Sequence, residues 1–166
     1  KSFTVIENVI MGYQLRSGFS FFDSFINSKK YQNNEEKVRE KAKKLLDFVG
    51  LKKVLDHQPA NLPQGLQKAL GIAISLASEP KMLLLDEPCA GMNIQESIQM
   101  VDLIKKIQFS GTTVMLIEHD MKVVMKVCDN ITVLSFGNKI AEGTPEQVRS
   151  NKDVRSAYLG GATYAS

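Results

Sequence analysis

Two polar clusters in the second half of the sequence follow apolar runs, and their side chains could do phosphate chemistry. The run Met82–Leu85 leads into Asp86 and Glu87, and the run Thr112–Ile117 leads into a cluster that contains His119. Carboxylate oxygens suit a hydrated Mg²⁺ that bridges nucleotide phosphates, which would be the role of Asp86. Glu87 could orient and polarise an attacking water, and His119 could contact the γ-phosphate or that water.

Each cluster also has an ordinary structural interpretation. Acidic residues commonly follow a strand, and a lone histidine is often a hydrogen-bonded surface or core residue. A functional role for His119 is nevertheless favoured, because the carboxyl ends of neighbouring parallel strands meet at one edge of a sheet. We therefore predict that Asp86, Glu87 and His119 converge at that edge and face a common space. His57 lacks such a context and is interpreted as a surface residue.

The elements that must position these clusters alternate between strands and helices. Strands are expected at residues 82–85, 112–117 and 131–136, with helices between them. Buried strands that alternate with helices predict an α/β fold, in which a parallel sheet with right-handed crossovers carries flanking helices. Gly137-Asn138 predicts a tight turn into an antiparallel edge strand over residues 139–142.

Helix starts are marked by capping residues. Thr4 and Thr144 each begin a capping-box pattern, and Asn93 and Asp120 can each cap a helix. The first 80 residues are mainly helical, with an amphipathic helix expected over Asn33–Val49 and another over residues 66–78. This part of the chain is expected to form a separate helical subdomain.

Two further features of the sequence can each be interpreted in two ways. The charged face of the Asn33–Val49 helix mixes bases with acids, so it is either a solvated face or a surface for an anionic partner. Four phenylalanines lie within seven residues and are either core or a socket for a partner helix. They are Phe19, Phe21, Phe22 and Phe25.

Composition excludes several classes of protein. With 166 residues, 43% hydrophobic and 23% charged, the chain is in the ordinary globular range. A net charge of +3 is too mild to dictate a nucleic-acid partner. Cys89 and Cys128 are distant in sequence and have no CxxC partner, which argues against a disulfide framework or a Cys-only metal site. The most apolar stretch, Ala69–Ser78, is far shorter than the ~20 residues of a membrane span.

Together these motifs resemble the nucleotide-binding subunit of an ABC transporter, along the whole chain. In that family the Asp-Glu pair is the Walker B aspartate and catalytic glutamate, which implies these roles for Asp86 and Glu87. The resemblance makes His119 the switch histidine. The implied fold is a partial P-loop NTPase domain of ABC type with an α-helical subdomain.

Two further segments match motifs that contact ATP bound to the opposite subunit. Ala90–Asn93 falls at the family's D-loop, and Leu62–Leu66 falls at its signature, just before a helix. Backbone N–H groups at a helix start favour an anion such as a γ-phosphate. The resemblance therefore implies ATP binding in trans by seven residues. They are Leu62, Pro63, Gln64, Gly65, Leu66, Gly91 and Asn93.

Finer motifs are similar to one branch, the LivG-type ATP-binding subunits of branched-chain amino acid importers. They include Ile-Glu-His-Asp-Met-Lys-Val-Val-Met at residues 117–125 and Gly-Thr-Pro-Glu-Gln-Val at residues 143–148. The resemblance implies an ATPase that uses ATP and Mg²⁺ at the cytoplasmic face of the membrane. It also implies three parts: a signature subdomain at 1–80, the Walker B and switch part at 81–143, and C-terminal helices at 144–166.

The implied partners are a second ATP-binding subunit, identical or related, and membrane permease subunits. A substrate-binding protein would act indirectly through the permease, and no nucleic acid is expected. Pro63, Leu66 and Ile94 depart from the general family pattern. None of the 11 glycines is followed by lysine, so a Walker A loop is absent from the sequence. We expect the chain to be the C-terminal part of a nucleotide-binding domain and to be inactive alone.

Two alternatives belong to other classes of protein. One is a non-catalytic interaction module. The other is a non-transport ABC-type ATPase that acts on nucleic acid or ribosomes, a possibility raised by the basic residues of the Asn33–Val49 helix. The acids interleaved with those bases count against the second alternative.

Overall fold

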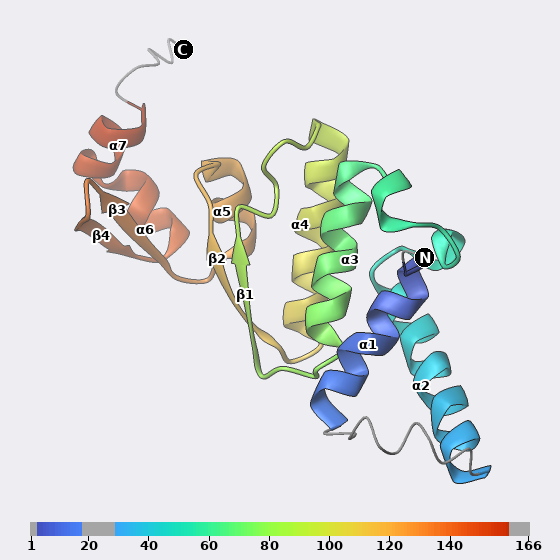
Figure 1. The fold of residues 1–166 in the computed structure, drawn as a ribbon. Helices are drawn as coiled ribbons and strands as arrows, with labels where there is room; N and C mark the ends of the chain where they lie inside the picture. The colour runs from blue at the N-terminus through green and yellow to red at the C-terminus, as the bar shows by residue number, and fades with distance from the viewer. Residues whose placement is uncertain (1–2, 18–28, 160–166) are drawn as a thin grey trace. The chain divides into compact units, whose positions relative to one another are not determined.

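The computed structural model describes residues 3–17 and 29–159 (Figure 1). The four clustered phenylalanines, and with them their two interpretations, lie outside the described residues. The chain divides into two compact units, Lys1–Met115 and Leu116–Ser166.

In its described residues, the first unit contains α-helices, 3₁₀ turns, the first strand and the first part of the second strand. In chain order these are α1 (Val5–Ser17), α2 (Lys29–Phe48), the 3₁₀ turns Lys52–Val54 and Pro59–Asn61, α3 (Gln64–Leu76), β1 (Met82–Asp86), α4 (Ile94–Phe109) and β2 (Thr113–Ile117), within which the unit boundary falls. The second unit continues with α5 (Met121–Val127), β3 (Ile131–Ser135), β4 (Asn138–Gly143), α6 (Pro145–Ser150) and α7 (Lys152–Leu159).

The core of the first unit lies between its helices. Helix α1 packs on α2 and α3, and α3 packs on α4. The residues buried at these contacts are apolar, as the amphipathic patterns predict. The largest fully buried side chains of this unit are Val5, Ile6, Val9, Leu46, Leu51, Ile104 and Ile107.

Local capping sets where the helices begin. At Thr4 the backbone N–H donates to the Glu7 carboxylate at 2.7 Å, and the Glu7 N–H donates back to the Thr4 hydroxyl. Reciprocal capping boxes also start α4 at Asn93 and α6 at Thr144, and Asp120 caps α5. These four predictions from the sequence are confirmed.

Gly12 allows α1 to approach α3 closely. A Cβ atom added at Gly12 would lie 2.8 Å from the carbonyl oxygen of Ile74 and 3.0 Å from the Cβ of Ala77. Because a backbone carbonyl of a packed helix cannot move aside easily, a side chain at this position would push the two helices apart.

We expect Gly12→Ala to lower the free energy of unfolding by about 1–3 kcal/mol, because overpacking outweighs the helix propensity that alanine adds. Gly71 on α3 is the matched control, since it is exposed and nothing lies within 4 Å of a Cβ built there. Gly71→Ala should instead be neutral or stabilise by up to about 1 kcal/mol. Urea unfolding followed by helical circular dichroism measures both, and equal effects at the two sites would contradict the packing argument.

Strands β1 and β2 form a two-stranded sheet with one open apolar face. The N–H of Thr113 donates to the carbonyl of Lys81 at 3.0 Å, so the two strands start side by side, as in a parallel pair. Leu83 and Leu85 are buried, whereas Leu84 between them is 67% exposed. Exposed apolar side chains on the two strands define, within the first unit, what we call the open sheet face: Met82, Leu84 and Met115.

Strand β3 was expected in the parallel sheet, but it pairs with β4 in a second, antiparallel sheet of two strands. The turn between them is formed by Phe136 (φ 48°) and Gly137 (φ 79°), one residue earlier than Gly137-Asn138. Positive φ at both turn residues matches the twist of a tight hairpin, which brings β4 beside β3 at once. The antiparallel strand predicted at 139–142 is confirmed over Asn138–Gly143.

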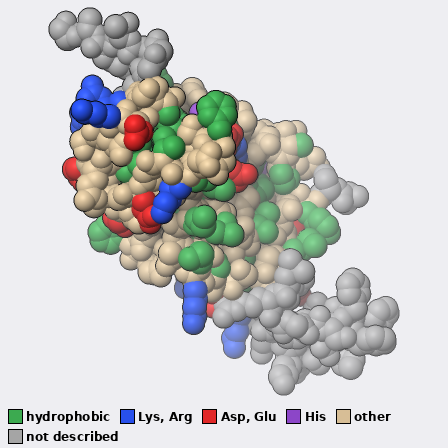
Figure 2. Space-filling model, turned by 90° about the vertical axis from the view of Figure 1, so that its left-hand side faces the viewer, with side chains coloured by type: hydrophobic (Ala, Val, Ile, Leu, Met, Phe, Trp, Pro, Cys, Tyr) green, Lys and Arg blue, Asp and Glu red, His purple; other side chains and the backbone are tan. Residues whose placement is uncertain are grey.

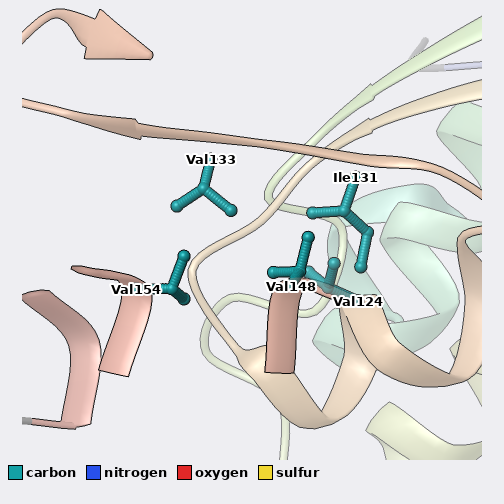
Figure 3. Close-up of a cluster of buried hydrophobic side chains, with 5 residues drawn as sticks. All are labelled: Val124, Ile131, Val133, Val148 and Val154. Atoms are coloured by element: carbon teal, nitrogen blue, oxygen red, sulfur yellow. The ribbon is translucent and has the colours of Figure 1, made fainter. Parts of the chain in front are cut away.

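The core of the second unit is a small valine-rich cluster. Figure 3 shows Ile131 and Val133 of β3 directed toward side chains from the helices of this unit. The helical members of the cluster are Val124, Val148 and Val154. The hydroxyl of Tyr158 donates to the carbonyl of Leu134 at 3.0 Å and ties α7 to β3.

Charge is mixed over the surface. On the face drawn in Figure 2, acidic and basic side chains are interspersed, in keeping with the net charge of +3. Among the described residues, no helix is both long and apolar enough to cross a bilayer. Cys89 is buried and Cys128 half-buried, and neither forms a disulfide. Burial raises the pKa of the Cys128 thiol, and the neighbouring Asp129 adds to the effect.

Candidate active site

Strand β1 delivers two adjacent carboxylates to its carboxyl end. Asp86 is the last residue of β1 and is exposed, and Glu87 follows it directly. Because side chains alternate along a strand, Asp86 shares the exposed face of β1 with Met82 and Leu84. The candidate Mg²⁺ residue therefore lies on the open side of the strand, where oxygen ligands are accessible.

Glu87 has an unusual backbone conformation. Its φ is +44°, in the left-handed region that favours glycine, and such a conformation costs ~1–3 kcal/mol and persists only when its surroundings hold it. The next residues form a turn, in which the N–H of Ala90 donates to the carbonyl of Glu87 at 3.1 Å and that of Met92 to Cys89 at 3.2 Å. We call residues 87–92 the catalytic loop.

The start of α3 lies against the end of the catalytic loop. Gly91 has φ +75°, and a Cβ there would be 2.8 Å from the side-chain nitrogen of Gln64. The positive φ favours glycine at this position, and a Cβ there would displace the end of the Gln64 side chain. The structure thus brings together Gln64 and Gly91, which the sequence placed in two separate motifs.

Lys68 makes a second contact between α3 and the catalytic loop. Its ammonium donates to the carbonyl oxygens of Glu87 and Ala90, both at 2.8 Å. Lys68 is one helical turn beyond Gln64, so both side chains leave the same face of α3. Lys68 is not among the residues for which the sequence predicts a role. The available signal was its position, since it is the only basic residue in α3 and lies four residues after Gln64.

The signature segment lies at the start of α3, which begins at Gln64, two residues earlier than the helix predicted over residues 66–78. Pro63 is the N-cap residue and makes no side-chain capping bond, and Leu62 before it is buried. The first N–H groups of a helix have no partner within the helix, so Gln64, Gly65 and Leu66 present backbone donors at this end. A phosphate from another molecule is a suitable acceptor for them.

A groove of about 580 Å³ runs beside the signature segment, but its charge does not suit a phosphate. Pro63, Gly65 and Leu66 contribute to its wall. The carboxylates in the lining outnumber the bases, and one of them, Glu96, lies 3.2 Å from the position of a Cβ on Gly65. The charged lining residues are Asp47, Glu96, Asp102 and Lys106.

Asn93 combines a motif position with a structural task. Its side-chain oxygen accepts the N–H of Glu96 at 2.9 Å, and the Glu96 carboxylate accepts the N–H of Asn93. This reciprocal cap fixes the start of α4 directly after the catalytic loop.

His119 follows β2, the strand that pairs with β1. Strand β2 ends at Ile117, and His119 is exposed. The backbone N–H of His119 donates to the Glu118 carboxylate at 3.2 Å. His119 belongs to the second compact unit, whereas Asp86 and Glu87 belong to the first. Convergence of these three residues therefore stays a prediction.

The described residues contain no cluster of three or more His, Cys, Asp or Glu side chains that could enclose a metal ion. A Mg²⁺ ion commonly keeps several waters and takes only one or two protein carboxylates, with phosphates as further ligands. The exposed Asp86 at the strand end fits this type of site.

Models of known protein families match two parts of the chain. The profile described as ABC transporter matches residues 5–90, which is more than half of the chain. The chain therefore belongs to the ABC transporter family. A second profile, described as branched-chain amino acid ATP-binding cassette transporter, matches residues 138–163.

Among similar proteins are ATP-binding subunits for branched-chain amino acid transport. The chain is 37% identical over 163 residues to LivG of Escherichia coli K12, covering 98% of this chain and 64% of that protein. BraF of Pseudomonas aeruginosa gives the same identity and coverage. The chain thus spans slightly less than two thirds of the length of these relatives.

Solved structures support the same fold. A crystal structure of the ADP conformation of an ATP-binding cassette of an ABC transporter matches with a TM-score of 0.75 and 32% identity, over 95% of this chain and 63% of that one. A nucleotide-free cassette matches with a TM-score of 0.75 and 30% identity, over the same shares. These matches confirm the predicted ABC-type α/β fold.

Proposed function

We propose that this chain forms part of the ATP-hydrolysing subunit of an ABC importer for branched-chain amino acids. The observation that carries the proposal is the contact between Gln64 and Gly91, which lie in the segments that resemble the signature and the D-loop, with Glu87 directly after β1. The 37% identity to LivG and BraF supports the choice of substrate class.

Asp86, Glu87 and His119 would act on ATP bound to the same subunit. Asp86 would hold a hydrated Mg²⁺, which supplies charge neutralisation at the phosphates. Glu87 would orient the attacking water and accept its proton, and His119 would contact the γ-phosphate or that water. The phosphate-binding loop that this chemistry needs would come from residues outside this sequence, since none of its glycines precedes a lysine.

The signature residues would act on ATP held by a second subunit. The helix start at Pro63–Leu66 would offer backbone donors to the γ-phosphate, with Gly91 and Asn93 close by in the D-loop. ATP would close the dimer of ATP-binding subunits, and hydrolysis would reopen it. The three-part division at residues 80 and 143 belongs to this proposal.

The proposed partners are a second ATP-binding subunit and the membrane permease, with a substrate-binding protein acting through the permease. The subunit would be peripheral, on the cytoplasmic face of the membrane. Nucleic acid has no place in this scheme, which is in keeping with the mixed surface charge.

The proposal predicts ATP hydrolysis only in the complete subunit, meaning this chain joined to the segment that carries its Walker A loop. The isolated chain should show no turnover above background, because the amides and lysine that cradle the phosphates are missing. Phosphate release measured for both proteins tests this. Turnover by the isolated chain, or none by the complete subunit with its permease, would contradict the proposal.

Substrate class is tested by uptake into proteoliposomes. The complete subunit, the permease and the binding protein from the same source should drive ATP-dependent uptake of leucine, isoleucine and valine. Methionine is an informative competitor, because a similar protein, 34% identical over 93% of this chain and 41% of its own length, is the methionine import subunit MetN of Haemophilus influenzae. Preferential uptake of methionine would overturn the assignment to branched-chain amino acids.

A further inference from the structure

The catalytic loop needs support, because its first residue is strained. Glu87 has φ +44°, and its carbonyl accepts both the N–H of Ala90 and the ammonium of Lys68. A non-glycine residue keeps such a conformation only when surrounding interactions hold it. Lys68 supplies one such interaction from another element.

Lys68 also holds the middle of the loop. The same ammonium donates to the carbonyl of Ala90, so a single positive charge bridges two carbonyl oxygens at 2.8 Å each. Hydrogen bonds from a charged donor are about twice as strong as neutral ones. The bond to Ala90 is part-buried, which limits competition from water there, whereas the bond to Glu87 is exposed.

The contact joins the catalytic loop to the signature helix of the same chain. Gln64 and Lys68 leave one face of α3, Gln64 meets Gly91, and Lys68 meets Glu87 and Ala90. The first turns of α3 thus contact the catalytic loop through two side chains. A shift of the loop would have to be accompanied by a shift of the start of α3, or these contacts would break.

From this geometry we infer that Lys68 is a positioning residue, whose ammonium clamps the backbone of residues 87–90 and so sets the position of the Glu87 carboxylate. The inference rests on the proposed function for its catalytic consequence but not for its structural one. The clamp acts on the water-activating residue, so it affects the chemical step rather than ATP binding.

Two substitutions and one control test the clamp. Lys68→Met keeps most of the side-chain volume but removes the charge, Lys68→Arg keeps a cationic donor, and Lys105→Met removes an exposed lysine from α4. Circular dichroism and thermal unfolding establish that each variant is folded before any other comparison.

The structural measurement is amide hydrogen exchange in this chain. Lys68→Met should raise exchange at Ala90 and Met92 by at least about threefold, because their turn hydrogen bonds lose support. Lys68→Arg should restore most of the protection, and Lys105→Met should leave it unchanged. Unchanged exchange at both amides in folded Lys68→Met would overturn the clamp, even if the ATPase proposal failed.

The catalytic measurement is ATP turnover by the complete subunit with its permease. Lys68→Met should lower kcat by about ten- to a hundredfold, since small displacements of a catalytic group have effects of this size, and KM for ATP should change by less than about twofold. Lys68→Arg should recover part of the loss. An increase in KM with unchanged kcat, or faster exchange with unchanged kcat, would overturn the positioning role. If the unmodified subunit has no activity, the proposed function fails while the exchange result still decides the clamp.

Discussion

Glu87→Gln in the complete subunit is expected to abolish ATP turnover while ATP binding is retained. Glutamine has nearly the same shape but cannot accept a proton from water, and loss of a general base typically lowers kcat by about 10²–10⁴-fold. Asp86 and the phosphate contacts are untouched, so the affinity for ATP should stay within about threefold of its original value.

Phosphate release and equilibrium ATP binding measure the two effects separately. Glu35→Gln is a matched control, because Glu35 is an exposed glutamate on α2 that is neither a candidate site residue nor part of the groove beside the signature segment. It should turn over ATP at the normal rate. If Glu87→Gln also did so, Glu87 would no longer be the residue that activates water.

The isolated chain is expected to self-associate through its open sheet face. Leu84 is 67% exposed and Met115 is 55% exposed, on strands that pair with each other. Burying an apolar side chain of this size is worth about 1.5–3 kcal/mol, so two copies gain by covering the face together. Light scattering at increasing protein concentration should show oligomers.

The double variant Leu84→Thr, Met115→Thr should be mainly monomeric, because threonine keeps a high strand propensity while adding a polar group. Phe109→Thr is the control for general surface hydrophobicity, since Phe109 is 96% exposed at the end of α4. That variant should still associate. If the unmodified chain stayed monomeric at high concentration, the open sheet face would not drive self-association and the prediction would be wrong.

Local features of the fold could be predicted from the sequence, because they depend on residues a few positions apart. The caps at Thr4, Asn93, Asp120 and Thr144 each rest on a side chain within three residues of the N–H that it binds. Such bonds form whenever the segment becomes helical, whatever surrounds it. The β3–β4 hairpin is local in the same way, although its turn lies one residue earlier than predicted.

Long-range pairing was harder to predict. Strand β3 has the apolar pattern of a buried parallel strand, but its pattern cannot show which strand will lie beside it. Likewise, Lys68 meets carbonyl oxygens 19 and 22 residues further along the chain. A lysine in an amphipathic helix is usually solvated. No sequence pattern shows which backbone carbonyl oxygens such a lysine will contact in the fold.

The candidate site likewise has one part that local sequence patterns predict and another that depends on long-range contacts. Asp86 and Glu87 were predicted from a strand followed by two acids, which is a local pattern, and β1 ends at Asp86, one residue later than predicted. The contact between Gln64 and Gly91 links two motifs that the sequence could identify only separately. Convergence of His119 with the carboxylates depends on how two compact units are arranged, so it stays a prediction.

The reciprocal cap at Asn93 and the end of β1 at Asp86 together restrict the number of residues that can lie between them. Both ends are fixed, one by strand pairing and the other by the bonds between Asn93 and Glu96. An inserted or deleted residue between positions 87 and 92 would have to unwind the first turn of α4 or pull Gly91 away from Gln64. The length of this segment is therefore constrained separately from the identities of Glu87 and Gly91, and homologous chains should align across it without gaps.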